Sequence, residues 1–157
     1  MAQARNYRPD GVGTVTPYLT LKGAPEAIEF YKRAFGAEER MRMPGPDGRI
    51  MHANLKIGDS TVYLAEEMMG MKAPTSLGGT PVSMHLYVPD CDATWKQAVA
   101  AGAKEKMPLQ DMFWGDRYGV LEDPFGHVWA VSTQKEELTP QEMGERGKAA
   151  MAKMSQS

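Results

Sequence analysis

Residues 18–37 read YLTLKGAPEAIEFYKRAFGA, and the same pattern returns at residues 85–103 as HLYVPDCDATWKQAVAAGA. Each stretch begins with a short strand-like segment, passes through a polar turn and continues with apolar residues at helical spacing up to a Gly-Ala pair. An offset of 67 residues places Tyr18 on His85. Each copy is too small to close a hydrophobic core of its own. The repeat therefore predicts a pseudo-symmetric fold with a groove between the copies.

Further strand-like segments follow each helix pattern, and the last of them is entered through a tight turn. The turn is GDS at residues 58–60 in the first copy and FGH at residues 125–127 in the second. Each copy therefore has the order β-α-β-β-β. We expect an α+β fold in which two tandem units, residues 14–66 and 82–133, form a pseudo-symmetric, barrel-like curled mixed sheet, followed by a C-terminal helix.

An arm, a linker and a tail accompany the single domain expected at residues 14–135. Residues 1–13 are polar and contain Gly and Pro, which predicts a flexible N-terminal arm. Residues 67–81 join the two units and are rich in Gly, Pro and Met, which predicts a long loop. The tail spans residues 136–157. It begins with the capping-box pattern TPQE at residues 139–142, which predicts a helix.

The composition is typical of a globular protein, because 42% of the 157 residues are hydrophobic and 24% are charged. A formal net charge of -2 at pH 7 argues against nucleic-acid binding, which requires a clustered basic surface. No apolar run approaches the roughly 18 residues that span a membrane, and the N-terminus lacks the apolar segment of a secretion signal. The single cysteine, Cys91, excludes an intramolecular disulfide. We expect a cytoplasmic protein without nucleic-acid or membrane partners.

Five stretches extend the pattern beyond the repeat: TPYL at 16–19, AIEFYKRAFGA at 27–37, PGPDGRIMHA at 44–53, FWGDR at 113–117 and DPFGHVW at 123–129. Together with the order of elements, they resemble the vicinal oxygen chelate superfamily, which includes glyoxalase I, extradiol dioxygenases, and fosfomycin- and bleomycin-resistance proteins. Within it, the chain is most similar to the PhnB-like branch. The resemblance implies a cavity between the two repeats that receives a small molecule, and a homodimer.

The sequence departs from this superfamily at the metal site. In the metal-dependent members, the resemblance implies four inward His or Glu ligands, on the first and last strand of each unit, around a divalent ion. The corresponding positions here are Thr16, Tyr63, Ser83 and Ala130. None of them is His, Asp or Glu, and such a set does not hold a divalent ion tightly. We therefore expect no cofactor.

A register shift of two residues would allow a metal site with fewer protein ligands. His85 follows Ser83 by two residues and so lies on the same face of its strand. There it would lie opposite Tyr18 of the twin strand, and His52 from the third strand of the first unit could meet it. Alternatively, His85 lines the cavity or is a buried, hydrogen-bonded histidine.

Two groups of residues are candidates for ligand contact. The first consists of Tyr18, His52, Tyr63 and His85, which strand alternation places on the inner faces. Trp129 neighbours Ala130, so it is expected to point the other way, into the helix-facing core or a dimer contact.

The second group lies in the loop FWGDR. Phe113 and Trp114 suit a flat ligand that stacks on an aromatic ring, and Arg117 could meet an anion. Alternatively, Asp116 and Arg117 form a local ion pair that pins the loop, and one of the aromatic rings fills the core.

Three functions are consistent with these residues. The one we favour is a small-molecule-binding protein that needs only shape, stacking and charge. The alternative is an enzyme, either a metal-dependent lyase, isomerase or dioxygenase that uses His52 and His85, or a metal-free enzyme with His85 as general base. In the third, the C-terminal helix and the Met-rich linker are interaction surfaces and the cavity is vestigial.

The substituted ligand positions generate a first prediction. Protein purified without a His-tag or chelator should contain no stoichiometric nickel, zinc, manganese or iron, because four neutral side chains bind a divalent ion weakly. Elemental analysis of the purified chain measures this. Near-stoichiometric metal that is lost in His85→Ala would contradict the prediction and establish the register shift.

Overall fold

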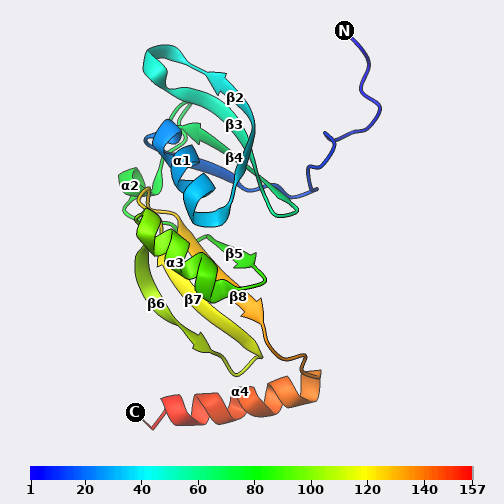
Figure 1. Ribbon diagram of the computed structural model, residues 1–157, viewed down its shortest axis with the longest axis vertical. Helices are drawn as coiled ribbons and strands as arrows, with labels where there is room; N and C mark the ends of the chain where they lie inside the picture. Colours follow the sequence, from blue (N-terminus) through cyan, green and yellow to red (C-terminus); the bar gives the residue numbers. More distant parts are fainter. Residues whose placement is uncertain (157) are drawn as a thin grey trace.

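The computed structural model describes residues 1–156, and its two halves repeat one topology (Figure 1). The first half contains β1 (Tyr18–Leu21), α1 (Ala24–Phe35), β2 (Glu38–Pro44), the short 3-10 helix η1 (Pro46–Gly48), β3 (Ile50–Ile57) and β4 (Ser60–Glu66). The second half contains β5 (Ser83–Tyr87), α3 (Cys91–Ala101), β6 (Lys104–Asp111), β7 (Asp116–Glu122) and β8 (Val128–Gln134). The helix α2 (Pro74–Leu77) lies in the linker, and α4 (Pro140–Met154) forms the tail.

Each half contains one four-stranded mixed sheet, with strand order β1-β4-β3-β2 in the first and β5-β8-β7-β6 in the second. The first and last strands of a half pair in parallel, and their registers repeat: Tyr18 lies beside Tyr63, and His85 lies beside Ala130. The expected α+β repeat and its offset are thereby confirmed. The two sheets are stacked along the long axis of the molecule (Figure 1). The barrel-like curl of both sheets around one cavity stays a prediction.

The repeat extends to the way in which each main helix begins. Gly23 precedes α1 in a left-handed conformation and offers no side chain, so the Glu66 carboxylate at the end of β4 accepts a hydrogen bond from the Ala24 N–H (2.7 Å). In the second half, the Thr133 hydroxyl at the end of β8 accepts from the Cys91 N–H (2.9 Å). Both acceptors satisfy a backbone donor that the helix itself leaves unpaired. The two pairs differ by the same offset in sequence.

The hydrophobic core lies between the sheets and the helices, and α1 packs against α3 where the halves meet. The buried face of α1 carries Ala27, Ile28, Tyr31 and Ala34, at the spacing the sequence predicts. Trp129 of β8 is 1% exposed and its ring lies 4.7 Å from that of Phe35. It therefore points into the helix-facing core, as expected.

The buried carboxylate of Asp123, in the turn between β7 and β8, joins the two halves. Its Oδ2 accepts from the Tyr31 hydroxyl (2.6 Å) and from the Trp129 indole N–H (2.9 Å). Its Oδ1 accepts from the backbone N–H groups of Phe125 and His127. A buried carboxylate is tolerated when its lone pairs are satisfied in this way. Helix α1 of the first half is thereby fixed to a turn of the second.

His127 supplies a second link between the halves. Its Nε2–H donates to the carbonyl oxygen of Thr20 in β1 (2.9 Å). The backbone N–H of His127 also donates to Asp123 within its own turn. The side chain, however, reaches across to the other sheet.

The segments outside the two halves are simple. Residues 1–17 contain no helix or strand. The tail helix α4 begins with the predicted capping box, in which Thr139 and Glu142 bond each other's backbone.

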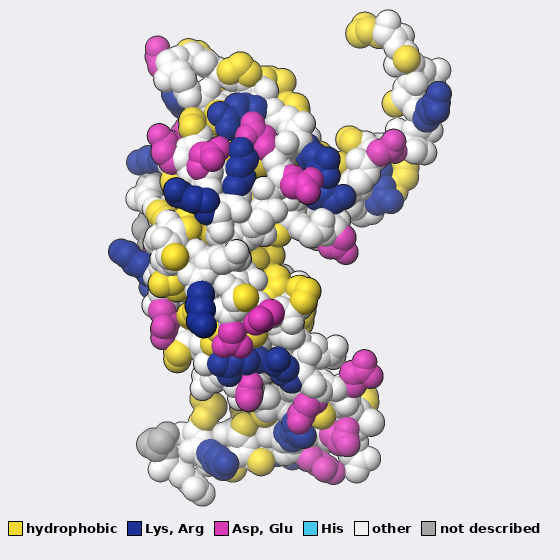
Figure 2. Space-filling view, in the orientation of Figure 1, with side chains coloured by type: hydrophobic (Ala, Val, Ile, Leu, Met, Phe, Trp, Pro, Cys, Tyr) yellow, Lys and Arg dark blue, Asp and Glu magenta, His cyan; other side chains and the backbone are white. Residues whose placement is uncertain are grey.

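Within residues 1–156, no helix is long and apolar enough to cross a membrane. Basic and acidic side chains are interspersed over the face of the molecule in Figure 2.

The Asp123 network generates a second prediction. Tyr31→Phe removes a hydrogen bond to a buried charged group, so it should lower the free energy of unfolding by about 2 kcal/mol. Urea denaturation of the variant and of Tyr7→Phe, a control in the exposed arm, measures this. An unchanged midpoint in Tyr31→Phe would contradict the proposed link between the halves.

The same variant has a pH signature. Burial, and then the charge of Asp123, raise the pKa of Tyr31 well above its ordinary value. The folded state therefore keeps this proton after the unfolded state, with its pKa of about 10, has lost it. The Tyr31 contribution is complete below that pH. Above it, the wild-type chain should lose about 1.4 kcal/mol more stability per pH unit than Tyr31→Phe.

Candidate functional site

Polar and aromatic side chains gather on the face of each sheet that is turned away from α1 and α3. In the first sheet, Leu19 and Leu64 face the core and are buried. Tyr18 and Tyr63 alternate with them and lie on the opposite face. We call these opposite surfaces the helix-free faces, and each carries one cluster of such side chains.

The first cluster consists of Tyr18, His52, Asn54 and Tyr63. The Tyr18 hydroxyl lies 2.6 Å from His52 Nδ1, and His52 Nε2 lies 2.5 Å from Asn54 Oδ1. Because the amide oxygen only accepts, Nε2 carries the hydrogen and Nδ1 accepts from the phenol. The Tyr63 ring packs edge-on against both the Tyr18 and the His52 rings. Burial, and then the proximity of Tyr63, raise the pKa of Tyr18.

The second cluster consists of His85, Tyr87, Trp114, Asp116 and Tyr118, from β5, β7 and the loop before β7. Asp116 is 5% exposed. Its Oδ2 accepts from the Tyr87 hydroxyl (2.9 Å) and the Trp114 indole N–H (3.1 Å). The hydrogen bond to Asp116, and then burial, raise the pKa of Tyr87.

His85 completes the second cluster. Its ring stacks on Tyr87 with the centroids 4.6 Å apart, and it contacts Tyr118 at 5.5 Å. Its Nε2 lies 2.8 Å from the hydroxyl of Ser132, which is fully buried. The His85 side chain is hydrogen-bonded but exposed, at the edge of an aromatic surface. It is therefore not the buried histidine that the sequence left open.

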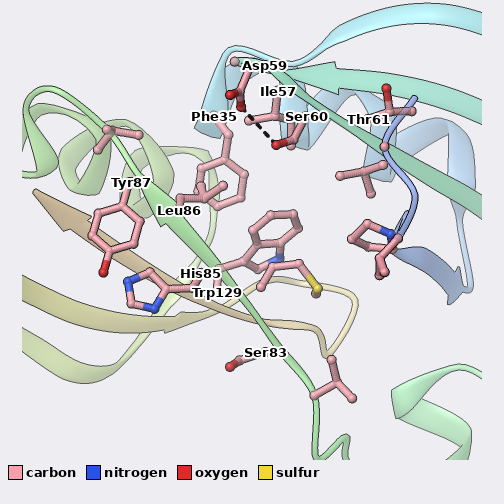
Figure 3. A pocket seen from close by; sticks show the side chains of 18 of the residues that line it. Phe35, Ile57, Asp59, Ser60, Thr61, Ser83, His85, Leu86, Tyr87 and Trp129 are labelled. Carbon is pink, nitrogen blue, oxygen red and sulfur yellow. Dashed lines mark hydrogen bonds between the residues drawn. The ribbon is translucent and has the colours of Figure 1, made fainter. Parts of the chain in front are cut away.

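A cleft of about 1010 Å³ lies between the two halves. One wall contains Asp59 and Ser60, where the turn after β3 leads into β4, and the other is β5, where His85 and Tyr87 lie side by side (Figure 3). A smaller cavity of about 290 Å³ lies between the halves and the linker, and Tyr18 lines it. Neither cavity is lined by residues of both clusters. Within one chain, the candidate residues are therefore divided between two surfaces.

The structure places Arg117 away from the second cluster. Its guanidinium bonds both oxygens of Asp92 in α3 (3.0 Å each) and reaches Asp111 at 3.4 Å. The pKa of Arg117 is raised, chiefly by the hydrogen bonds to Asp92. The Asp116–Arg117 ion pair considered from the sequence does not form, because neighbouring residues of β7 point to opposite faces. The guanidinium expected to meet an anion is already bonded by two carboxylates.

The two loop aromatics also have different surroundings. Trp114 belongs to the second cluster and meets the Tyr118 ring edge-on at 5.3 Å. Phe113 is 39% exposed and packs beside Gly147 of α4, at 3.4 Å from the position that a Cβ there would occupy. Phe113 therefore holds the tail helix, and only Trp114 shares a surface with His85.

The four positions that correspond to metal ligands do not fit a divalent ion. Ala130 has no donor atom and is buried, and the Thr16 hydroxyl donates to the Gly13 carbonyl. His52 and His85 belong to different sheets, and no ring contact or hydrogen bond joins their clusters in the described chain. Within residues 1–156, no three His, Cys, Asp or Glu side chains form a group that could hold a metal.

Sequence reasoning did not assign Asn54, Tyr87 and Tyr118 to the site. The signal for Tyr87 was available, since it follows His85 by two residues and shares its face. Tyr118 stands in the same relation to Asp116. The same signal was available for Asn54, which follows His52 by two residues in β3, and the pairing of β3 and β4 places it beside Tyr63.

Comparison with known proteins agrees with the fold. Residues 13–131 match the sequence family described as the Glyoxalase/Bleomycin resistance protein/Dioxygenase superfamily. The uncharacterized protein Rv0887c of Mycobacterium tuberculosis is 47% identical over 134 residues, which cover 82% of this chain and 79% of that protein.

Two solved structures share the fold. TioX from Micromonospora sp. ML1 is 27% identical and has a TM-score of 0.62, with 81% of this chain and 100% of TioX covered. A PhnB protein from Bacillus cereus is 18% identical and has a TM-score of 0.58, with 77% and 99% covered, a likeness of fold alone.

Proposed function

The chain belongs to the glyoxalase, bleomycin resistance protein and dioxygenase superfamily, and we propose that it binds a small organic molecule on the helix-free faces of its sheets. The exposed aromatic surface of the two clusters carries this proposal. Tyr18 is 52% exposed and Tyr87 is 64% exposed, although both hydroxyls are fixed by hydrogen bonds. Held aromatic rings with polar groups beside them are what a pocket for a flat organic ligand requires.

Each cluster has donors and acceptors at its rim. The first presents the phenol of Tyr63 and the Tyr18–His52–Asn54 chain of hydrogen bonds. The second presents Asp116 at the base of its rings. Such groups set the orientation of a ligand, while ring faces supply most of the contact area. Nothing in this arrangement requires a metal ion, and the donor set described above does not fit one.

We further propose that two copies pair so that the first cluster of one chain and the second cluster of its partner enclose one ligand. Three features support this. The clusters do not share a cavity within one chain. The edge strands β1 and β5 each have one side without a strand neighbour. Met43, beside His52 on the first helix-free face, is 47% exposed. Pairing would complete the barrel-like curl that the sequence suggests.

Metal-free acid–base chemistry is the second candidate, and the first cluster favours it. His52 is held as the Nε2–H tautomer with Nδ1 facing the Tyr18 phenol. If a ligand presented an acidic C–H bond to the Tyr18 oxygen, the C–H proton could move to that oxygen while the phenol proton moved to Nδ1. The ligand would be left as a carbanion and His52 as an imidazolium that keeps its bond to Asn54.

The binding proposal is tested by screening small molecules against the full chain. Tyr63→Leu and Tyr87→Leu should each weaken a captured ligand by about tenfold, because each removes one aromatic contact. Isothermal titration measures this, with Tyr7→Leu in the arm as the control. A ligand whose affinity is the same in all three variants would place the site elsewhere. Sedimentation equilibrium should give twice the mass of one chain, and a monomer at all concentrations would overturn the pairing.

The acid–base candidate makes a separate prediction. A captured carbon acid incubated in D2O should exchange its hydrogen at least about a hundredfold more slowly with Tyr18→Phe than with the wild-type chain. Proton NMR of the ligand follows this exchange, and Tyr7→Phe in the exposed arm is the matched control. Equal exchange rates in Tyr18→Phe, His52→Gln and the wild-type chain would refute catalysis by the first cluster and leave binding intact.

A further inference from the structure

We propose that the ligand of the second cluster is an organic cation, such as a quaternary ammonium, held by Asp116 and the surrounding rings. This inference rests on the proposed binding function and adds the chemical class of the ligand. The two clusters differ in one respect that determines the charge of the ligand we propose. The first has only phenol, imidazole and amide groups, whereas the second has a carboxylate at its base.

The carboxylate of Asp116 has no cationic partner among residues 1–156. It is 5% exposed, and its two side-chain donors, Tyr87 and Trp114, are neutral groups that share one oxygen. Within the described residues, no Lys, Arg or His nitrogen forms an ion pair with it. Arg117, adjacent in sequence, bonds Asp92 on the other face. A buried carboxylate without a counter-charge costs folding energy, which a bound cation would offset.

Aromatic side chains surround the Asp116 carboxylate. Hydrogen bonding to the carboxylate holds Tyr87 and Trp114 beside it, and Tyr118 meets Trp114 edge-on at an interplanar angle of 74°. Ring faces attract ammonium groups through their quadrupole, and this attraction is strongest where water is excluded. The Tyr87 ring is 64% exposed and lines the cleft between the halves, so it is the part of this cluster that a ligand meets from solvent. Aromatic walls over a carboxylate favour a cation over a neutral molecule and repel an anion.

The charge of the neighbouring groups supports the same choice. His85 stacks on the other side of Tyr87 and points its Nε2 to the Ser132 hydroxyl. Within residues 1–156, the lysine and arginine side chains that form ion pairs all bond carboxylates other than Asp116. A ligand ammonium would therefore meet Asp116 without competition from an ion pair of the chain itself.

The test compares choline with 3,3-dimethylbutan-1-ol, in which a carbon atom replaces the charged nitrogen. The indole N–H signals of the full chain are followed by ¹⁵N NMR, and Trp114→Phe assigns the reporter. Choline should shift the Trp114 signal saturably and leave Trp129, buried and bonded to Asp123, unmoved. The neutral isostere should bind about tenfold more weakly or worse. Sodium chloride at equal concentration controls for ionic strength.

Charge removal gives the second arm. Asp116→Asn should weaken choline by about tenfold or more and leave the isostere unchanged, whereas Asp47→Asn, in the distant β2–β3 turn, removes a charge without effect. The comparison of the two probes on the wild-type chain holds even if Asp116→Asn fails to fold. Equal binding of both probes would overturn the cation but retain the ligand site. Absence of any shift with choline would overturn the cation, and the screen described above would still judge the binding proposal.

Discussion

The hydrogen bond from the Tyr31 hydroxyl to the buried Asp123 carboxylate ties the first half of the molecule to the second. Each half has its own sheet and helix, and neither can bury both faces of its sheet by itself. The carboxylate takes a phenol from α1, an indole from β8 and two backbone donors from its own turn. Hydrogen bonds to charged groups are the stronger ones in proteins. Together with the His127–Thr20 hydrogen bond and the packing of α1 against α3, this contact sets how the two halves are arranged.

The two halves retain one backbone plan and have diverged in side-chain chemistry. Equivalent positions that start the helices carry Glu66 and Thr133, an ionised and a neutral acceptor for the same kind of N–H group. Equivalent positions in the first strands carry Tyr18 and His85. The register of the sheet depends on the alternation of buried side chains, so the helix-free faces are free to vary. That freedom explains how one half acquired a neutral cluster and the other a carboxylate.

The repeat, the order of elements and the helix positions could be predicted, because they depend on local periodicity and on turn residues. The clusters could be predicted only in part. Tyr87 reaches Asp116 across β8, so the contact depends on the strand order β5-β8-β7, which no local pattern encodes. The face on which Arg117 lies could not be predicted for a simpler reason, since the face of a residue in β7 depends on where the strand begins. Strand alternation predicts on which face of its own sheet a residue lies, but it does not predict how the two sheets are placed relative to each other. Whether His52 and His85 converge depends on that placement.

The link between Tyr31 and Asp123 joins residues 92 positions apart, and this distance has a consequence for how the protein is made. A ribosome adds residues from the N-terminus, so α1 is complete long before the turn that receives its phenol has been synthesised. Until then, the aromatic face of α1 has no cover and could meet the same face of another nascent chain. Contacts of such long sequence separation also slow folding. The aromatic face of α1 in the first half therefore stays exposed until the second half has left the ribosome.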